Sequence, residues 1–514
     1  MRIGVDVGGT HTDAVLMDGD RVINSVKSLT TADVSSGIFN ALQHILSGVD
    51  TTTVEAVMLG TTQFTNAVIE RKHLSEVAAV RIGLPSGDGL PPKTGWPEDI
   101  AKALGDHVYM LHGGTLFDGS PLDDLRQDEI DSLIADIKQK QLSAVTISAA
   151  FSPMNPEPEL EVARQIKAAI PDMEITCSHE IGRLGLLERE NAALLNASLL
   201  RLSQQVVRSF GTALKDLQLS CPFFISQNDG TLMDSEFVQK YPALTFSSGP
   251  TNSLRGACKL TGLDDAIVID IGGTTSDIGI LQGGFPRESN IVIEVGGVRT
   301  NFRMPDILAL GLGGGSRVNE DGTTIGPDSV GHDLVTMGLS FGGDVMTTTD
   351  IQVAAGNLDV KTGIDVSIDE GIVENALGTI HRMLNEGVEK MMPTSEQFPV
   401  IMVGGGAVLA TEKLDAAAKM LTPENSGVAN AIGAAIAQIG GEVERLVNYR
   451  ETPRDEVLEE VSAEATEQAI KAGADPDTIR IADIEEITIS YMAEGSTKLR
   501  VKAIGDILLS GRGD

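Results

Sequence analysis

Two runs of alternating apolar residues, one at the N-terminus and one near the middle of the chain, share the same pattern. Residues 2–7 read RIGVDV, and residues 266–271 read AIVIDI. Each run is followed by a second apolar stretch that ends in a glycine-containing turn, at residues 18–20 and 282–284. Alternation with a period of two, broken by Gly or Asp, predicts a β-hairpin. The pattern therefore predicts two hairpins at equivalent places in two related lobes.

Between and after these hairpins, helical periodicity alternates with short apolar runs, which is typical of an α/β protein with a parallel or mixed sheet. Helices are predicted at residues 127–141, 157–170, 184–217, 349–389, 426–441 and 454–473. A strand is predicted at residues 143–151, a strand running into a glycine loop at residues 399–409, and a strand, a loop and a helix at residues 54–72. Residues 83–120 are rich in Gly and Pro, and we expect them to form a long loop or insertion.

Two segments of this pattern carry further expectations. In residues 426–441, Gly427, Asn430 and Ala434 share one helical face, where small side chains would let a second helix cross closely and act as a hinge. A small Ala-rich packing helix explains the same residues equally well. After residue 450, a charged helix precedes two alternating strands, which indicates an appended helix-plus-hairpin module for oligomer or partner contact.

The length of the chain, 514 residues, is too great for one ordinary hydrophobic core and predicts two or three domains. We expect a first lobe at residues 1–185, a second lobe at residues 186–445, and the appended module at residues 446–514. Apolar residues make up 41% of the chain, aromatic residues 4%, and glycine occurs 56 times. This composition fits an α/β fold with tight connections and excludes a disordered chain.

The formal net charge of −34 excludes a nucleic-acid backbone or an anionic membrane as the expected partner. Cys177, Cys221 and Cys258 are widely spaced and form no zinc-ligand pattern, so we expect small buried residues in a reducing compartment. No apolar stretch reaches the ~18 residues that span a membrane. Because a strand begins directly at the N-terminus, we expect no signal peptide and a cytoplasmic protein.

The strongest chemical signal is the repeat of DVGGTHTD at residues 6–13 as DIGGTTSD at residues 270–277. Paired glycines permit a tight turn with positive φ and let the backbone approach a phosphate, while successive N–H groups form an anion-binding nest. The expected phosphate contacts are Gly8, Gly9, Thr10, Thr12, Gly272, Gly273, Thr274 and Thr275. A plain hairpin turn with a left-handed glycine is the alternative, which two equivalent copies make much less attractive.

Aspartates would repel a bare phosphate, so their presence in both copies indicates a cation between them, most simply hydrated Mg²⁺. Asp6, Asp270 and Asp277 are the expected metal-side residues, acting partly through water. Asp270 and Asp277 are also the expected catalytic carboxylates.

Four further polar residues near these motifs have both a functional and a structural interpretation. His332, beside Asp333, is a candidate base or metal ligand, and His11 is a candidate contact to phosphate or substrate. A lone histidine is more often structural. Arg71 and Lys72 are candidate contacts to an anionic substrate, and solvated helix residues explain them equally well.

The order of these motifs resembles that of the actin, sugar-kinase and heat-shock-chaperone ATPase superfold. Within it, the chain resembles the ATP-binding subunit of the hydantoinase/oxoprolinase family over roughly residues 1–440. The segments that carry the resemblance are residues 4–15, 60–72, 227–233, 247–257, 270–277, 311–318 and 326–333. Three features depart from the family pattern: His11 replaces a Phe, no Pro-Gly-Pro run follows Asp333, and the chain ends earlier than in longer members.

The resemblance implies a two-lobed α/β actin-like ATPase fold, with duplicated ribonuclease H-like lobes and a small C-terminal appendage. It implies ATP and Mg²⁺, a small cyclic amide or imide substrate such as a hydantoin or a 5-oxoproline-like lactam, and often a second hydrolytic subunit in a homo- or hetero-oligomer. Relatives in the family carboxylate ketones. Gly404, Gly405 and Gly406 would lie against the base and ribose of the nucleotide. A small-molecule kinase and an ATP-driven regulatory or reactivating module remain open on the same superfold.

Overall fold

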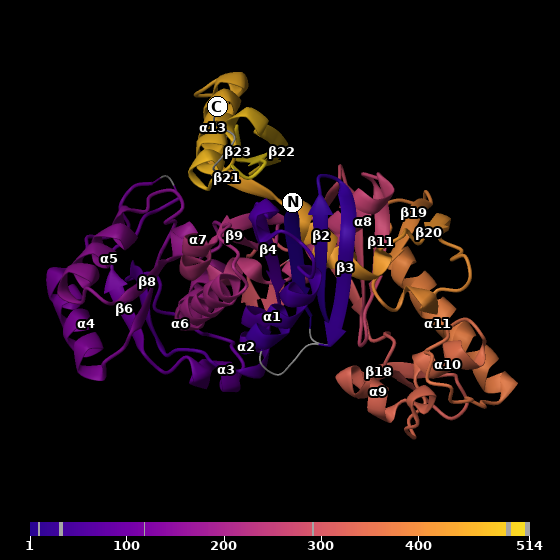
Figure 1. Ribbon diagram of the computed structural model, residues 1–514. Helices are drawn as coiled ribbons and strands as arrows, with labels where there is room; N and C mark the ends of the chain where they lie inside the picture. The colour runs from indigo at the N-terminus through magenta and orange to yellow at the C-terminus, as the bar shows by residue number, and fades with distance from the viewer. Residues whose placement is uncertain (9–10, 30–33, 118, 290–291, 490–494, 509–514) are drawn as a thin grey trace.

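A computed structural model of the chain describes residues 1–8, 11–29, 34–117, 119–289, 292–489 and 495–508. Its main elements are a nine-stranded sheet, a six-stranded sheet and a four-stranded sheet (Figure 1). In that view the four-stranded sheet and its helices lie on the left, and the six-stranded sheet lies on the right. The two predicted hairpins belong to the nine-stranded and the six-stranded sheet respectively, so each lobe contains one of them.

The nine-stranded sheet contains the N-terminal hairpin and has the strand order β22-β23-β21-β10-β9-β4-β1-β2-β3. Its strands are β1 (Arg2–Val7), β2 (His11–Asp18), β3 (Arg21–Leu29), β4 (Ala56–Thr61), β9 (Phe223–Ser226), β10 (Thr231–Asp234), β21 (Gln438–Asn448), β22 (Arg480–Thr488) and β23 (Ser496–Gly505). Ile3, Val5 and Val7 are buried on the side of α1 (Val34–Ile45) and α6 (Leu186–Asp216). The residues between them face the opposite side, as a period of two requires.

The four-stranded sheet is parallel and has the order β6-β5-β7-β8. Its strands are β5 (Val77–Leu84), β6 (Val108–His112), β7 (Ala144–Ala149) and β8 (Glu174–Cys177). The helices α4 (Gln127–Lys140), α5 (Glu157–Ala169) and α6 pack against this sheet, while α2 (Gln63–Glu70) and α7 (Ser235–Lys240) pack against α6. Residues 83–120 are not the predicted long loop, because they contain α3 (Glu98–Ala103) and β6. The β6 strand completes the sheet, which the Gly and Pro content of this segment concealed.

The six-stranded sheet contains the second hairpin. Its strands are β11 (Ala266–Ile271), β12 (Ser276–Gln282), β13 (Phe285–Pro286), β16 (Ile307–Leu310), β19 (Phe398–Val403) and β20 (Ala417–Leu421). Beside it lie two short strand pairs and α9, namely β14 (Ile293–Val295), β15 (Val298–Thr300), β17 (Ser316–Val318), β18 (Ile325–Ser329) and α9 (Leu334–Met337). The helix predicted at residues 349–389 is two helices, α10 (Thr348–Ala354) and α11 (Glu370–Met391), with irregular chain between them.

Two helices cross between the two large sheets, α8 (Ser248–Thr261) and α12 (Ala429–Ile436). A Cβ placed on Gly256 would lie 1.9 Å from the carbonyl oxygen of Ala429, and one on Gly433 would lie 1.8 Å from that of Asn252. The predicted close crossing is therefore present. The predicted extent of the helix at residues 426–441 is wrong, since α12 ends at Ile436 and β21 follows.

The crossing also does not use the predicted face. Gly427 lies in a short 3-10 turn before α12, and a Cβ placed on it would meet no atom within 4 Å. On α12, the glycine that permits the close approach is Gly433, and on α8 it is Gly256. The predicted face was wrong because only eight of residues 426–441 are in the α-helix.

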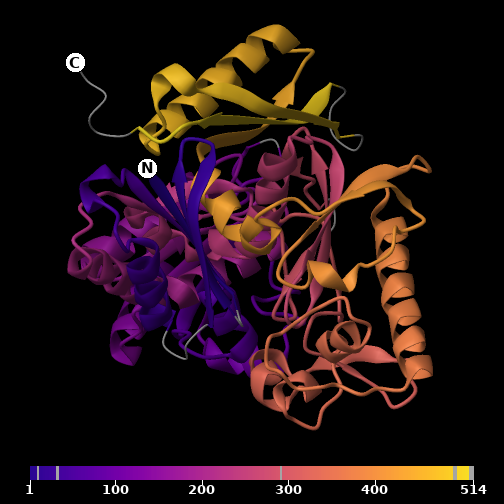
Figure 2. The same ribbon diagram turned by 45° about the vertical axis from the view of Figure 1, so that its right-hand side comes forward.

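The C-terminal helix α13 (Arg454–Lys471) and the hairpin of β22 and β23 lie above the rest of the molecule in Figure 2. The hairpin is not a separate sheet, because β23 pairs with β21 from Asn448 to Ile439 and so continues the nine-stranded sheet. Strands on both sides of residue 446 thus belong to one sheet, and so do strands on both sides of residue 186. The domain boundaries stay a prediction.

None of the helices in the described residues combines the length and the apolar content needed to cross a membrane. All three cysteines are unpaired. Cys177 is buried as expected, whereas Cys221 and Cys258 are only partly buried.

Candidate functional site

The two hairpins have the same register. In the first, Asp6 of β1 lies opposite Asp13 of β2. In the second, Asp270 of β11 lies opposite Asp277 of β12. Each hairpin thus presents a pair of carboxylates at the last rows before its turn, which is the equivalence that the repeated motif predicted.

The turns close in the same way. The N–H of Gly8 donates to the carbonyl of His11 at 3.0 Å, and the N–H of Gly272 donates to the carbonyl of Thr275 at 2.9 Å. These are equivalent positions in the two copies of the motif. The backbone is therefore duplicated together with the sequence.

The glycines of the two turns that the structure describes do not adopt the predicted positive φ. Among the described residues, the positive-φ glycines do not include Gly8, Gly272 or Gly273. A Cβ on Gly8 or Gly272 would approach a carbonyl oxygen at 3.2 or 3.4 Å, which is tight but not prohibitive. The expectation of positive φ is wrong at these three positions, and Gly9 and Thr10 lie outside the described residues.

The second turn accepts two backbone hydrogen bonds from Gly314 and Gly315, which follow β16. The N–H of Gly314 donates to the carbonyl of Gly272 at 3.0 Å, and the N–H of Gly315 donates to that of Gly273 at 2.7 Å. Both carbonyls are thereby occupied. Within the described part of the chain, the N–H groups of Gly273 and Thr274 have no partner. The turn therefore offers free donors, which suits an anion.

The hydroxyl groups differ in their exposure. Thr274 and Thr275 are exposed at the second turn, where a phosphate group can reach them. Thr12 is fully buried in β2, so its hydroxyl does not face solvent. The predicted phosphate contact is geometrically open for the first two residues and closed for Thr12 in this conformation.

A polar cluster surrounds the first carboxylate pair. The Nδ2 of Asn430 donates to Asp6 at 3.0 Å and to Asp13 at 3.1 Å. The Nδ2 of Asn252 donates to Asp6 at 3.4 Å. The ammonium group of Lys27 bonds both oxygens of Asp13 at 2.8 Å. The carboxylate of Asp13 is thus neutralised by a cation, while the donors that reach the Asp6 carboxylate from the described residues are both neutral amides.

Helix α8 connects this cluster to the second carboxylate pair. Asn252 contacts Asp6, and the hydroxyl of the next residue, Ser253, donates to Asp270. Two consecutive side chains of one helix therefore hold one aspartate from each lobe. The carboxylate of Asp277 has no hydrogen-bond or ion-pair partner among the described residues.

Three of these buried carboxylates, Asp6, Asp270 and Asp277, have raised pKa values. Burial, and next the Asp13 carboxylate, raises the pKa of Asp6 to about 6. Burial, and next the Asp270 carboxylate, raises the pKa of Asp277 to about 7, and burial also raises the pKa of Asp270. A hard divalent cation with oxygen ligands would relieve this repulsion. Among the described residues, no three of these aspartates bring carboxylate oxygens within 4.8 Å of one another, so they would hold Mg²⁺ partly through its waters.

Asp277→Asn is expected to stabilise the metal-free protein at neutral pH. An acid whose pKa is higher in the folded state than in the unfolded state binds its proton more tightly when folded, so its contribution to stability falls as pH rises. The variant should match the wild type near pH 4 and gain its full advantage of about 2–4 kcal/mol above pH 7. Thermal melts in EDTA from pH 4 to pH 8.5 measure this difference. A difference that does not change with pH would contradict the raised pKa.

The predicted glycine loop after β19 lies against the end of β11. Gly404 has a φ of +84°, and a Cβ there would lie 2.3 Å from Oδ1 of Asp270. The N–H of Gly406 donates to the carbonyl of Ile271 at 2.8 Å. Gly405 is exposed. The loop therefore adjoins the carboxylate site, and its contact with the base and ribose stays a prediction.

His332 lies on the surface, with 74% of its side chain exposed and Asp333 at 3.2 Å. Its segment reaches the second turn through Gly315, which accepts a hydrogen bond from the N–H of Val330 and donates its own N–H to the carbonyl of Gly273. The structure does not bring the imidazole into contact with the carboxylates, and its catalytic role stays a prediction.

Of the other three residues with two interpretations, Arg71 and Lys72 favour the structural one, and His11 fits both. The guanidinium of Arg71 donates to Asp99 and to the carbonyl of Gly296 at 2.8 Å, which favours its structural interpretation. Lys72 pairs with Glu70 on the surface, as a solvated helix residue would. His11 is half-buried at the first turn, and burial, followed by Lys27, lowers its pKa. A neutral imidazole there is compatible with either of its interpretations.

Sequence reasoning missed five residues of the cluster, namely Asp13, Lys27, Asn252, Ser253 and Asn430. Asp13 was within reach, because it occupies in the first motif the position that Asp277 occupies in the second. Asn252 and Ser253 lie in the segment 247–257 that carries the family resemblance, and Asn430 was assigned to a helix crossing, but none of the three was predicted as a site residue. Lys27 of β3 lies in no motif.

Two family models match the chain. The model of the hydantoinase/oxoprolinase N-terminal region matches residues 2–170, and the hydantoinase/oxoprolinase model matches residues 189–394. The first match contains the β1–β2 hairpin, and the second contains the β11–β12 hairpin.

Among known proteins, the chain is 28% identical over 389 residues to caprolactamase subunit alpha of Pseudomonas jessenii, which covers 70% of this chain and 54% of that protein. It is 25% identical over 419 residues to the acetophenone carboxylase gamma subunit of Aromatoleum aromaticum, which covers 73% and 56% respectively. The chain spans little more than half the length of these two relatives.

The fold has close counterparts among solved structures. The ATP-dependent caprolactamase from Pseudomonas jessenii matches with a TM-score of 0.81 at 20% identity, covering 98% of this chain and 87% of that one. Nucleotide-free acetone carboxylase matches with a TM-score of 0.71 at 16% identity, covering 99% and 88%. The predicted two-lobed α/β ATPase-like fold is confirmed. Since the two family models together match most of the chain and include both carboxylate hairpins, the chain belongs to the hydantoinase/oxoprolinase family.

Proposed function

We propose that the chain is the ATP-using component of an enzyme that opens a small cyclic amide or imide. The observation that carries the proposal is the pair of equivalent hairpins, which bring two carboxylate pairs and free N–H donors to the junction of two lobes. Such a site suits the transfer of a phosphoryl group, which needs positioning and charge neutralisation more than covalent chemistry. A relative in the same family is named as an ATP-dependent caprolactamase.

An unstrained amide is a poor electrophile because its nitrogen lone pair is delocalised onto the carbonyl. In the proposed reaction the carbonyl oxygen attacks the γ-phosphorus of ATP, the bond from that phosphorus to ADP breaks, and an O-phosphorylated imidate forms. One water then adds to the carbon, and the ring C–N bond breaks as the nitrogen takes up a proton. A second water releases phosphate from the resulting acyl phosphate. The products are ADP, phosphate and the ring-opened carboxylic acid, which is an amino acid when the ring is a lactam.

The proposed roles of the residues follow from where they lie in the site. The second turn, with the N–H groups of Gly273 and Thr274 and two exposed hydroxyls, would bind phosphate oxygens. Asp6, Asp270 and Asp277 would hold Mg²⁺ or its waters. The ion would neutralise charge on the phosphates. Closure of the lobes about α8 and α12 would exclude water, so that ATP is not hydrolysed before the cyclic amide binds.

A second subunit is part of the proposal. The named relatives are an alpha subunit and a gamma subunit, so each works with other chains. We propose that ring opening of the activated amide is completed by a separate hydrolytic subunit. The gene beside the one for this chain is the first place to look for it.

The proposal predicts that ADP release depends on a cyclic amide. Purified protein with Mg-ATP should release ADP at least about 10-fold faster with one of hydantoin, 5-oxoproline or caprolactam than without substrate, because positioning the acceptor supplies part of the barrier reduction. The assay is run with and without the candidate second subunit. A stable phosphorylated product would indicate a small-molecule kinase, and stimulation by a protein client alone would indicate a regulatory module. Either outcome would overturn the proposal.

A further inference from the structure

A group of potential metal ligands lies at the carboxyl edge of the parallel four-stranded sheet. Strand β8 ends at Cys177, a 3-10 turn over residues 178–180 follows it, and Glu159 is in the first turn of α5. The Sγ of Cys177, a ring nitrogen of His179 and a carboxylate oxygen of Glu159 all lie within 4.8 Å of one another. Across the described part of the chain, no other three His, Cys, Asp or Glu side chains come together in this way.

The carboxylate of Glu159 fixes the position of His179. It is fully buried and accepts two hydrogen bonds from that residue, from the backbone N–H at 3.1 Å and from Nδ1 at 2.6 Å. Its other oxygen accepts the N–H of Ala149 at 2.8 Å and the hydroxyl of Ser178 at 2.6 Å. Although burial opposes the ionised form, the bonds from His179 lower the pKa of Glu159. Glu159 is therefore a carboxylate, and the proton between it and His179 is on Nδ1.

A second histidine of the same sheet shows which feature of the group is special. His112, at the end of β6, bonds Glu129 of α4 through the same two groups, its N–H at 2.9 Å and its Nδ1 at 2.7 Å. A histidine held by a carboxylate thus occurs twice here, and by itself it indicates no ligand. What distinguishes His179 is the thiol of Cys177, which adds a third ligand atom of a different type.

The electrostatics around the thiol favour a cation. Burial, and next the carboxylates of Glu159 and Glu180, raise the pKa of the Cys177 thiol. Apart from the imidazole, no cationic side chain of the described residues bonds Glu159 or Cys177. The buried guanidinium of Arg189 donates to Ser178 and to three backbone carbonyls instead. A metal ion that replaced the thiol proton would therefore meet two negative ligands and one neutral ligand.

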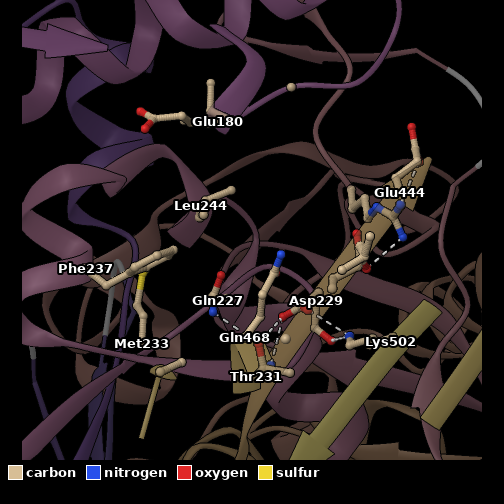
Figure 3. A pocket seen from close by; sticks show the side chains of 18 of the residues that line it. Glu180, Gln227, Asp229, Thr231, Met233, Phe237, Leu244, Glu444, Gln468 and Lys502 are labelled. Carbon is tan, nitrogen blue, oxygen red and sulfur yellow. Dashed lines mark hydrogen bonds and ion pairs between the residues drawn. The ribbon is translucent and has the colours of Figure 1, made fainter. Parts of the chain in front are cut away.

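The group can be reached from solvent. His179 lines a pocket of about 990 Å³ that the turn between β9 and β10 and the C-terminal helix also line. Its side chain is 16% exposed, whereas Glu159 and Cys177 are buried. In Figure 3 the next residue, Glu180, lies at the end of this pocket that is away from Lys502. An ion can therefore enter from the pocket, and its open coordination position lies on the His179 side.

The ligand types and their spacing identify the class of metal. A thiolate, an imidazole and a carboxylate suit Zn²⁺ and Co²⁺, whereas Mg²⁺ prefers oxygen ligands alone. Tetrahedral ligands at ~2.0–2.3 Å from zinc lie about 3.3–3.6 Å from one another. The spacings in the group range from 2.6 Å between Nδ1 of His179 and the Glu159 oxygen to at most 4.8 Å. Shifts of about 1 Å therefore suffice to form a zinc site.

We propose that Glu159, Cys177 and His179 form a Zn²⁺ site, with a water molecule from the pocket as the fourth ligand. The ion takes the place of the proton between Nδ1 and the Glu159 oxygen, and the neutral imidazole then carries its proton on Nε2. The thiol proton of Cys177 is released to solvent, because a coordinating thiol is deprotonated. The three remaining hydrogen bonds on Glu159 keep the carboxylate oriented. This inference does not depend on the proposed function.

The test is a titration of the metal-free protein with Co²⁺, which binds the same kinds of site as Zn²⁺. A thiolate ligand gives Co²⁺ a charge-transfer absorption band in the near ultraviolet, and oxygen ligands alone give none. The wild type should develop this band with a single equivalent of Co²⁺, and Zn²⁺ should remove it by displacement. Cys177→Ser should lose the band, and His179→Gln should weaken Co²⁺ binding at least about 10-fold.

Two matched controls separate the site from other groups. Cys258→Ser removes a partly buried thiol elsewhere, and His112→Gln removes the histidine that is held by a carboxylate without a thiol beside it. Both should bind Co²⁺ like the wild type. The melting temperature of the wild type should rise with Zn²⁺, and that of Cys177→Ser should not. If Cys177→Ser does not fold, His179→Gln decides the result, since its side chain is partly exposed.

Three results would overturn the inference. They are the absence of a thiolate band in the wild type, a band that persists in Cys177→Ser, and a wild-type affinity for Co²⁺ in His179→Gln. Each would leave His179 as a histidine held by a carboxylate, like His112. None of them bears on ADP release, so the proposed function is tested separately.

Discussion

Asp270→Asn is expected to lower the rate of ATP turnover by a factor of about 10³, because removal of one charged group from a preorganised phosphoryl-transfer site costs 10²–10³ or more. The carboxylate of Asp270 lies where α8, the second hairpin and the glycine loop after β19 meet. It accepts a hydrogen bond from Ser253 of α8, it faces Asp277 across the hairpin, and Gly404 lies against its Oδ1. An amide of the same shape keeps the packing and removes the charge, so the loss should appear in turnover rather than in folding.

The measurement is ADP release by the wild type and the variant under saturating Mg-ATP and the best cyclic amide. Asp18→Asn is the matched control, since Asp18 is an exposed carboxylate at the far end of the β1–β2 hairpin and should keep full turnover. The melting temperature of Asp270→Asn without metal should equal or exceed that of the wild type, because burial raises the pKa of the aspartate it replaces. Turnover within a factor of three of the wild type would show that the second hairpin is not the phosphoryl-transfer site.

The sequence was sufficient to predict the two hairpins because their information is local. A period of two, a glycine-containing turn and an eight-residue motif each lie within one short segment, and the motif recurs with the same spacing. The equivalent register of the two aspartate pairs follows from that spacing. The long helix α6 was predictable for the same reason, since its periodicity extends over more than eight turns.

The rest of the site depends on contacts between distant parts of the chain. Asn430 bonds Asp6 across 424 positions of sequence, and Lys27 bonds the carbonyl of Gly427 across 400. Nothing in the local pattern of α12 or β3 marks these residues as partners of the hairpins. Only the fold, which places α12 beside β1, makes them part of the site.

Errors in the predicted elements have a similar origin. Small residues in 426–441 fit a helix, but the segment becomes β21 from Gln438 because that strand pairs with β10 and β23. Tertiary pairing thus overrode a weak local preference. Residues 83–120 have the composition of a loop, yet β6 forms because β5 offers it an edge.

Gly433→Ala is expected to destabilise the protein by about 3 kcal/mol, near the upper end of the usual cost of overpacking a core. A Cβ at this position would lie 1.8 Å from the backbone carbonyl oxygen of Asn252. Backbone cannot rotate away as a side chain can, so α8 and α12 must move apart. The gain in helix propensity from Gly to Ala, about 1 kcal/mol, offsets only part of this cost. Movement of α8 also shifts Asn252 and Ser253, which hold one aspartate from each lobe, so turnover should fall together with stability.

Urea unfolding and ADP release measure the two effects of Gly433→Ala on one preparation. Gly427→Ala is the matched control, because it adds the same methyl group only six positions earlier in the chain. A Cβ at Gly427 would meet no atom within 4 Å. Its stability should stay within ~0.5 kcal/mol of the wild type. If both variants are equally stable, the helices tolerate separation and the crossing does not fix the site. If Gly433→Ala is destabilised but retains full turnover in its folded fraction, α8 does not position the carboxylates. Loss of both properties in Gly433→Ala alone would identify the crossing as the element that couples the two lobes.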